Sequence, residues 1–258
     1  GDKLNASDLN KMFAVYQNLP YQSNRPYGLA CDDDSNFYTG YGVGSYIAIH
    51  KRIRKGTSLF NEGTLAQGHW VYTTTYKELY SMTILGLYIY AWVRKTSDSL
   101  YYLLRITISD GTLQEMTISG TAPDADYGTL ITTDGTYIYL ADLDTTLVRK
   151  YTLSGTTITY SSAITMPDVV KGFTANASNF WFTTGQLVGA TVVDALYKCD
   201  LAGANESYVI SDSIQIATAG EPFDMAISDE VVYMLYIARI GQGTGGFYTS
   251  TIQAVDYV

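Results

Sequence analysis

The sequence contains few basic residues: 16 Lys and Arg stand against 25 Asp and Glu, and the formal net charge at pH 7 is −9. Proteins that bind DNA or RNA neutralise phosphates with a basic surface, so we expect no nucleic-acid partner. Long apolar runs are missing too, and none reaches the roughly 18 residues that a membrane-spanning helix needs. The chain begins with Gly and carries no basic-plus-apolar signal peptide, so we expect a processed chain or a piece of a longer protein.

Cysteine and histidine are nearly absent, with Cys31 and Cys199, His50 and His69 as the only examples. Neither Cys belongs to a CxxC pair and the His residues are not clustered, so the sequence predicts no zinc site. Two small buried or half-buried thiols are favoured over a disulfide. No GxSxG elbow or Cys/His pairing accompanies the imidazoles, which are expected to be structural. We therefore predict no catalytic, cofactor-binding or metal-binding residue.

Two acidic stretches and one glycine run need interpretation. Asp32–Asp34 and the pair Asp142 and Asp144 carry the oxygen ligands that hard cations prefer, but neither fits an EF-hand loop. We interpret them as turns and keep calcium as the alternative. Gly241–Gly246 satisfies GxGxxG, a pattern that binds a pyrophosphate only where it opens a helix. Because the following Phe247–Val255 is strand-like, the glycine run is interpreted as a hairpin loop.

What the sequence does contain is a repeated pattern of short strands. Its clearest copy is Gly128–Ile164, where aromatic and β-branched runs alternate with breaks of Asp, Ser and Gly that favour tight turns. One such sheet cannot bury both of its faces, so it needs neighbours of its own kind. Within this copy the expected strands are Thr129–Thr132, Tyr137–Leu140, Leu147–Leu153 and Thr156–Tyr160.

The pattern recurs at about 43 to 52 residues, a spacing typical of propeller blades. Second-strand aromatic or apolar positions recur at Phe37, Tyr88, Tyr137, Phe180 and Val232. A third strand follows that runs from an apolar residue through a basic one to a Gly turn, where a Cβ would strain the hairpin. These third strands are Ile49–Gly56, Leu104–Gly111, Val148–Gly155 and Tyr197–Gly203.

The sequence therefore predicts an all-β fold, a β-propeller with five blades of four antiparallel strands over residues 27–258. Six blades are the alternative, because His69–Met82 is longer than one strand. The last unit, Pro222–Val258, ends before a fourth strand. We expect residues between Met12 and Gln22 to supply it and close the ring.

Residues 1–26 differ from the rest and are interpreted as an attachment or closure segment. Leu9, Met12, Phe13 and Tyr16 follow the spacing of one helix face, and Pro20 would end that helix. The letters from Phe13 to Leu19 also fit a strand, so the prediction is a short helix or arm. The residues expected to mediate attachment are Leu4, Leu9, Met12, Phe13 and Tyr16.

The first ten residues, Gly1–Asn10 (GDKLNASDLN), resemble the GDxL[TN]AxxLN segment found near the N-termini of bacteriophage tail-fibre and appendage proteins. In that family the segment precedes a structural or receptor-binding region of the virion. The resemblance implies an extracellular or virion location. It also implies partners among other protein subunits of an assembly, copies of this chain included, and a host-surface glycan or receptor.

These observations favour a non-enzymatic structural or binding module. The signature motifs of invertase-like glycosidases and of sialidases are absent. The chain contains 24 Tyr, a residue that suits protein interfaces and sugar stacking when exposed; Tyr72, Tyr76, Tyr80 and Tyr248 are expected in loops or at edges. The alternative is a secreted carbohydrate-active propeller, either a lectin or a glycoside hydrolase that uses two carboxylates.

Overall fold

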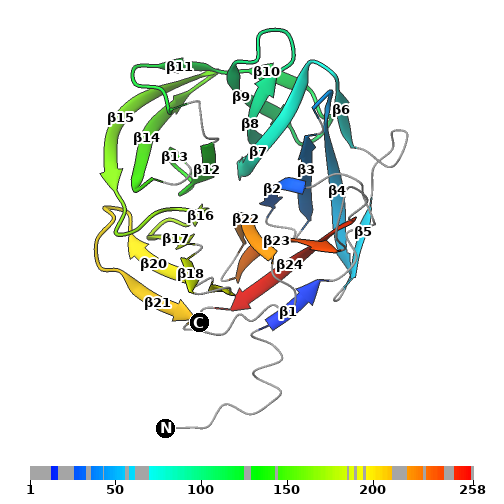
Figure 1. Ribbon diagram of the computed structural model, residues 1–258. Coiled ribbons are helices and arrows are strands. Elements are labelled where there is room, and N and C mark those ends of the chain that lie inside the picture. Colours follow the sequence, from blue (N-terminus) through cyan, green and yellow to red (C-terminus); the bar gives the residue numbers. More distant parts are fainter. Residues whose placement is uncertain are drawn as a thin grey trace, which may run out of the picture.

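The computed structural model describes residues 13–16, 26–32, 36–42, 44–55, 58–61, 70–124, 129–142, 145–184, 186–188, 191–193, 196–210, 220–228, 231–240 and 247–256. Within these ranges every regular element is a β-strand, and no helix is long and apolar enough to cross a membrane. The strands form a β-propeller, in which small antiparallel sheets are arranged around a central axis (Figure 1).

Each larger sheet is built mainly from strands that follow one another in the chain, as the repeat predicted. The first contains β2 (Pro26–Cys31), β3 (Phe37–Gly42), β4 (Ile47–Lys55), β5 (Ser58–Asn61) and β6 (Val71–Thr73). The next contains β7 (Tyr76–Leu85), β8 (Tyr88–Lys95), β9 (Tyr101–Thr107) and β10 (Leu113–Glu115). The third contains β11 (Thr117–Ser119), β12 (Thr129–Thr133), β13 (Ile138–Asp142), β14 (Leu147–Ser154) and β15 (Thr157–Thr165).

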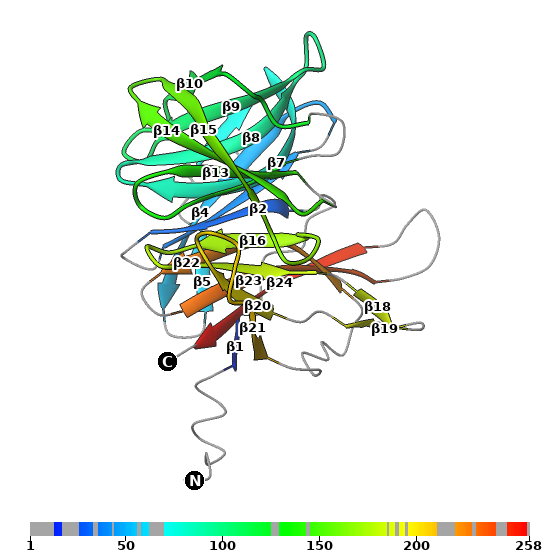
Figure 2. The same ribbon diagram turned by 90° about the vertical axis from the view of Figure 1, so that its left-hand side faces the viewer.

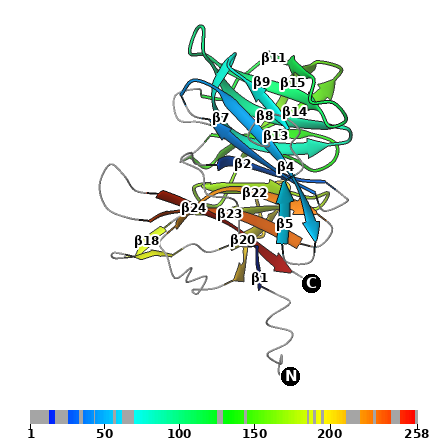
Figure 3. The ribbon, with the colours of Figure 1, turned by 90° about the vertical axis from the view of Figure 1, so that its right-hand side faces the viewer.

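The C-terminal part of the chain continues the pattern. One sheet contains β16 (Gly172–Ala175), β17 (Asn179–Thr183), β20 (Leu196–Asp200) and β21 (Ser207–Ile210). The hairpin of β18 (Gln186–Val188) and β19 (Thr191–Val193) is inserted into it and projects to one side of the ring (Figures 2 and 3). The last sheet contains β22 (Gly220–Ser228), β23 (Val231–Ile240), β24 (Phe247–Asp256) and β1 (Phe13–Tyr16).

The inner strands of these sheets make a closed circle around the axis. β2 contacts β7, β7 contacts β12, β12 contacts β16, β16 contacts β22, and β22 contacts β2. The circle is visible at the centre of Figure 1, with the later strands of each sheet further out. No inner strand is therefore left with an open side.

The N-terminal strand completes the last sheet. β1 pairs antiparallel with β24, with Phe13 opposite Val255 and Tyr16 opposite Ile252. This pairing agrees with the expectation that residues after Met12 supply the missing strand. It joins the two ends of the chain within one sheet, so that the ring is closed by hydrogen bonds rather than by a covalent link.

Two expectations are wrong. The helix alternative for Phe13 and Tyr16 is wrong, because β1 pairs with the edge of β24; the strand alternative is the one that the structure contains. The stretch around His69–Met82 is not an additional unit. β6 pairs with β4, and β7 begins the neighbouring sheet. The boundary between a segment 1–26 and a propeller 27–258 stays a prediction.

Apolar side chains fill the spaces between neighbouring sheets. One buried cluster joins the β2–β6 sheet to the β7–β10 sheet, a second joins β7–β10 to β11–β15, and a third joins β11–β15 to the β16–β21 sheet. Glycine permits the closest approach. Gly28 and Gly40 lie opposite each other in β2 and β3, and a Cβ on either would come within 2.6 to 2.7 Å of the Leu79 side chain.

The two repeated sequence signals meet in the sheets. In several sheets an aromatic residue of the second strand lies opposite a basic residue of the third: Tyr90 faces Arg105, Tyr139 faces Lys150, and Trp181 faces Lys198. The Lys150 ammonium lies 3.6 Å from the centroid of the Tyr137 ring, and the Lys198 ammonium 5.2 Å from that of Trp181. Such cation–π contacts let a basic residue sit in a largely apolar interface.

Removing β1 tests the closure of the ring. Deletion of residues 1–25 leaves one side of β24 unpaired and should lower Tm by about 10 °C, because several backbone hydrogen bonds are lost. Deletion of residues 1–10 keeps β1 and is the control, which should melt like the full chain. Differential scanning calorimetry measures both. Equal melting temperatures for the two truncated chains would contradict closure by β1.

Candidate functional site at the centre of the ring

The inner strands end around a central cavity of about 490 Å³. Its wall is formed where β2, β7, β12, β16 and β22 run into their following turns, so the cavity opens at one end of the axis. It has the size of a pocket for a small molecule or a few side chains. The lining residues are Ala30, Cys31, Asp32, Thr83, Ile84, Leu85, Gly86, Thr133, Asp134, Gly135, Thr174, Ala175, Asn176, Ala226 and Ile227.

Asp134, at the wall of this pocket, organises the turn between β12 and β13. Its Oδ1 accepts hydrogen bonds from the backbone N–H groups of Thr136 (2.8 Å) and Tyr137 (2.7 Å). Its Oδ2 accepts the Tyr139 hydroxyl at 2.7 Å. Gly135 adopts φ +90°, which the tight turn requires and which a residue with a Cβ rarely adopts.

Asp32 and Asn176 occupy the corresponding turns of two other sheets. Asp32 Oδ1 accepts a hydrogen bond from the Asn36 backbone N–H at 2.8 Å. Its Oδ2 accepts hydrogen bonds from the Asn36 side-chain amide (2.9 Å) and from the Tyr38 hydroxyl (3.2 Å). Asn176 Oδ1 accepts from two backbone N–H groups in the same manner. The turn interpretation of Asp32 is confirmed; Asp33 and Asp34 lie outside the described residues.

A buried carboxyl lies next to the pocket residues, within the circle of inner strands. Asp224 in β22 has no solvent exposure. Its Oδ2 accepts hydrogen bonds from the Leu29 N–H of β2 (2.8 Å) and from the Met82 N–H of β7 (3.1 Å). Its Oδ1 accepts a hydrogen bond from the Ser81 hydroxyl (2.8 Å). The Ser81 oxygen accepts the Ile131 N–H of β12 at 3.1 Å. One side chain thus connects β22 directly to β2 and β7 and, through Ser81, to β12.

Irregularities in the strands bring these groups to the axis. The β22–β23 register shifts between Pro222 and Asp224, and the β7–β8 register shifts between Leu79 and Ser81. Such a bulge redirects the next side chain. Burial raises the pKa of Asp224 well above its usual range, and the hydrogen bonds from Leu29, Ser81 and Met82 oppose that shift.

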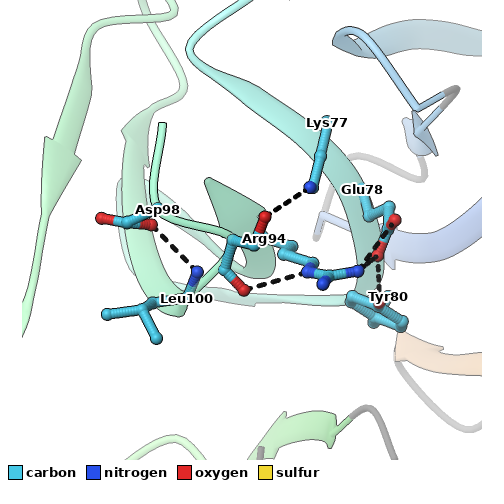
Figure 4. Close-up of polar contacts among 7 residues, drawn as sticks. Lys77, Glu78, Tyr80, Arg94, Asp98 and Leu100 are labelled. Atoms are coloured by element: carbon cyan, nitrogen blue, oxygen red, sulfur yellow. Dashed lines mark hydrogen bonds and ion pairs between the residues drawn. The ribbon is translucent and has the colours of Figure 1, made fainter. Parts of the chain in front are cut away.

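A second polar cluster lies at the other end of β7, where β8 turns into β9 (Figure 4). The Lys77 ammonium donates to the Ser99 hydroxyl at 2.7 Å, and the Arg94 Nε donates to the Ser99 carbonyl at 2.9 Å. Glu78 accepts hydrogen bonds from Arg94 (3.4 Å) and from the Tyr80 hydroxyl. Ser99 has φ +60°, and these contacts hold its turn. The cluster is a structural support for the hairpin.

The remaining candidates from the sequence are mostly structural. Cys31 and Cys199 are buried and form no disulfide, as predicted. His50 is 1% exposed and its ring packs against Tyr41 at 5.0 Å. Asp142 forms an ion pair with Arg149 and accepts a hydrogen bond from the Asp124 N–H, so this carboxyl has a structural role. Asp144 lies outside the described residues.

The tyrosine and attachment predictions have mixed outcomes. Tyr72 is 46% exposed. Tyr76 lies in β7, the edge strand of its sheet, but it is 5% exposed and its hydroxyl donates a hydrogen bond to Glu115 at 2.7 Å, so it is not an exposed tyrosine. Of the attachment residues, Phe13 and Tyr16 lie in β1. Leu4, Leu9 and Met12 are outside the described residues, and attachment by this set stays a prediction. No pattern in the sequence pointed to Asp224 or Ser81.

No known family model matches the sequence, and neither does any curated protein. Among solved structures, the fold is similar to a chain from the crystal structure of the nidogen/laminin complex, with a TM-score of 0.50 and 10% identity over 81% of this chain and 91% of that chain. It is also similar to hydrazine synthase from Kuenenia stuttgartiensis, with a TM-score of 0.49 and 10% identity over 93% of this chain and 66% of that chain. The similarity to the chain from the nidogen/laminin complex supports the β-propeller fold.

Two substitutions at Asp224 separate hydrogen bonding from charge. Asp224→Ala leaves the donors of Leu29, Ser81 and Met82 buried without a partner and should lower the free energy of unfolding by about 3–5 kcal/mol. Asp224→Asn keeps an acceptor for the two N–H groups and a donor toward Ser81, so it should change stability by less than about 1 kcal/mol. Urea unfolding measures both. Equal losses in the two variants would contradict the role of the network.

The pH dependence of stability tests the protonation of Asp224. Because the folded-state pKa is raised, the folded protein keeps a proton that the unfolded chain loses above about pH 4. Stability from this group is therefore greatest in acid and falls as the pH rises toward the folded pKa. The wild-type free energy of unfolding minus that of Asp224→Asn should decrease between pH 4 and 8. A difference that stays constant or increases would show that Asp224 is ionised throughout.

Proposed function

We propose that this chain is a non-enzymatic binding module that holds part of a partner protein in the pocket at the centre of the ring. The observation that supports this most is the origin of the pocket wall. Every inner strand contributes to it, and Asp224 and Ser81 join β22, β2, β7 and β12 directly next to the pocket residues. A pocket on such a rigid support loses little conformational entropy when it binds.

The chemistry of the wall favours binding over catalysis. General acids and bases need a carboxyl that is available to the substrate, whereas both oxygens of Asp134 accept hydrogen bonds within its own turn. Both oxygens of Asp32 do the same. The Asp134 carboxyl can accept a further hydrogen bond from a ligand, since a carboxylate has about four acceptor positions.

The N-terminal segment is proposed to connect this module to an assembly. The resemblance of Gly1–Asn10 to tail-fibre and appendage proteins is the basis for placing the chain outside a cell or on a virion. Because β1 is paired with β24, a partner bound to the residues before Phe13 would be joined directly to the last sheet. Other subunits of that assembly, copies of this chain included, are the proposed partners there.

We further propose that the ring has five blades. The basis is the closed circle of β2, β7, β12, β16 and β22, each followed by its own antiparallel neighbours. An electron-density map of the chain, viewed down the axis, tests the count directly. Four or six radial sheets in that map would contradict it.

A carbohydrate-active propeller is the second candidate. The observation in its favour is that Asp32 and Asp134 lie at one pocket together with the hydroxyl of Thr83, a polar lining that also suits a sugar. A glycan array separates the two functions. Saturable binding of a glycan that is lost in Thr83→Arg would establish the second candidate in place of the first.

Peptide selection tests the main proposal. A library of random peptides is panned against the full chain, and the enriched peptides are measured against Thr83→Arg, whose long side chain fills the pocket. We expect these peptides to lose at least about tenfold in affinity, equivalent to about 1.4 kcal/mol.

The matched control is Thr112→Arg. Thr112 is exposed in the turn between β9 and β10, so the same side chain is added away from the pocket. Thermal melts establish that both variants are folded. Peptides that bind wild type and Thr83→Arg equally, or a library that yields no binder, would contradict a partner-binding role for the pocket.

A further inference from the structure

The hydrogen-bond network of Asp224 is connected to the wall of the central pocket through four strands. Each residue that the network joins is followed, within two residues of its strand, by a residue of the pocket wall. These pairs, with the network residue first, are Leu29 and Ala30, Met82 and Thr83, Ile131 and Thr133, and Asp224 and Ala226. Because a strand rises about 3.3 Å per residue, each network residue lies within about 7 Å of the wall along its strand.

The Asp224 carboxyl has no charged partner within the described part of the chain. Its donors are the backbone N–H groups of Leu29 and Met82 and the hydroxyl of Ser81, all of them neutral. The side chain has no solvent exposure, so water does not compensate a charge there either. The free energy of this group therefore depends strongly on whether it carries a proton.

The ionisable residues on the strands around Asp224 form no ion pair with it in the part of the chain that is described. β12 and β16 contain no ionisable residue, and β23 places Leu235 opposite Asp224. Those of the other strands are Tyr27 and Cys31 of β2, Tyr76, Lys77, Glu78 and Tyr80 of β7, Glu221 of β22, and Tyr233, Tyr236 and Arg239 of β23. The four of β7 have hydrogen-bond partners at the end of that strand away from the pocket.

The two protonation states of Asp224 hold Ser81 in different ways. When the carboxyl is ionised, Oδ1 accepts a hydrogen bond from the Ser81 hydroxyl at 2.8 Å. When it is neutral, Oδ1 carries the proton and donates to the same Ser81 oxygen, while Oδ2 keeps its two backbone N–H donors. Burial raises the pKa of Asp224, and the hydrogen bonds offset only part of that effect. The closed ring therefore favours the neutral form.

Ionisation affects the strands that form the pocket wall. A buried carboxylate without a cation becomes more stable when water reaches it. Water reaches Asp224 only if the inner strands hold it less closely, because the residue is fully buried. Since the same strands continue into the wall, the ionised ring has a less ordered pocket. A partner segment that binds such a pocket loses more conformational entropy and binds more weakly.

We propose that Asp224 is a proton switch next to the central pocket: the neutral carboxyl keeps the pocket in its binding form, and ionisation weakens the binding of a partner segment. This inference rests on the proposed function, because it names the regulation of the same pocket. Linkage is reciprocal, so a bound partner in turn favours the neutral carboxyl.

The first test needs no ligand. The ¹⁵N-labelled full chain is titrated from about pH 4 to about pH 9, and the amide resonances of Ala30, Thr83, Thr133 and Ala226 are followed by NMR. These pocket amides should share one titration step that is missing in Asp224→Asn, which stays neutral at every pH. Asp32, Asp134 and the histidines are retained in that variant, so their own titrations are not removed with the step.

Two further variants complete this titration. Asp110→Asn is the matched control, because Asp110 accepts the Thr112 N–H in an exposed turn outside the pocket, and the step should persist there. Ser81→Ala removes one donor from the ionised carboxyl and should move the step to higher pH. This shift tests the switch even if Asp224→Asn does not fold, which thermal melts establish.

The second test measures binding. The peptides enriched by panning are measured on both sides of the titration step. Wild type and Asp110→Asn should bind them at least about tenfold more weakly on the alkaline side, equivalent to about 1.4 kcal/mol. In Asp224→Asn the ratio of the two affinities should be close to one.

The outcomes separate this inference from the proposed function. If the pocket amides show no step, or if the step persists in Asp224→Asn or is lost in Asp110→Asn, the switch is wrong while the pocket remains a candidate binding site. If the step is present but the peptides bind equally or more tightly on the alkaline side, the coupling to binding is wrong and peptide binding stands. If the library yields no binder, the proposed function and this inference are both overturned.

Discussion

The carboxyl of Asp224 is the polar contact on which the centre of this propeller depends. Buried apolar clusters also join neighbouring sheets, but apolar side chains attract one another without fixing a register. The hydrogen bonds of Asp224 are directional. Its carboxyl accepts hydrogen bonds from backbone N–H groups of β2 and β7 and from the Ser81 hydroxyl, and Ser81 accepts one from a backbone N–H of β12. Removing a carboxyl from water is costly, and its complete set of donors offsets that cost. The positions of β22, β2, β7 and β12 relative to one another are thereby specified.

The pocket is a consequence of this arrangement. Strands that are tied together at the axis must separate into their turns within a few residues, and the turn residues then surround a space. The turns themselves are held by acidic or amide side chains, as at Asp32, Asp134 and Asn176. The same carboxyls that shape the turns therefore give the pocket its negative charge, so fold and recognition share their residues.

The sequence predicted those features that depend on neighbours in the chain. The Asp134–Gly135 turn, the aromatic second strands and the basic third strands are local patterns, and the structure contains each of them. The β-propeller follows from their repetition. Periodicity did not resolve Phe13–Tyr16, which fits a helix face and a strand equally well; its pairing with β24 decides the matter. Asp224 was missed because its partners Leu29 and Met82 are 195 and 142 residues away, and the bulges that aim it at the axis leave no local signal. The burial of Tyr76 was not predicted because its partner Glu115 lies in another strand of the sheet.

Amide hydrogen exchange measured by NMR tests the central claim most directly. If Asp224 and Ser81 hold the inner strands together, the amides of Leu29, Met82 and Ile131 open only when the whole domain unfolds. Their exchange rates should be among the slowest in the chain and should report the global free energy of unfolding. Faster exchange at these three amides than in outer strands such as β10 and β15 would contradict the account.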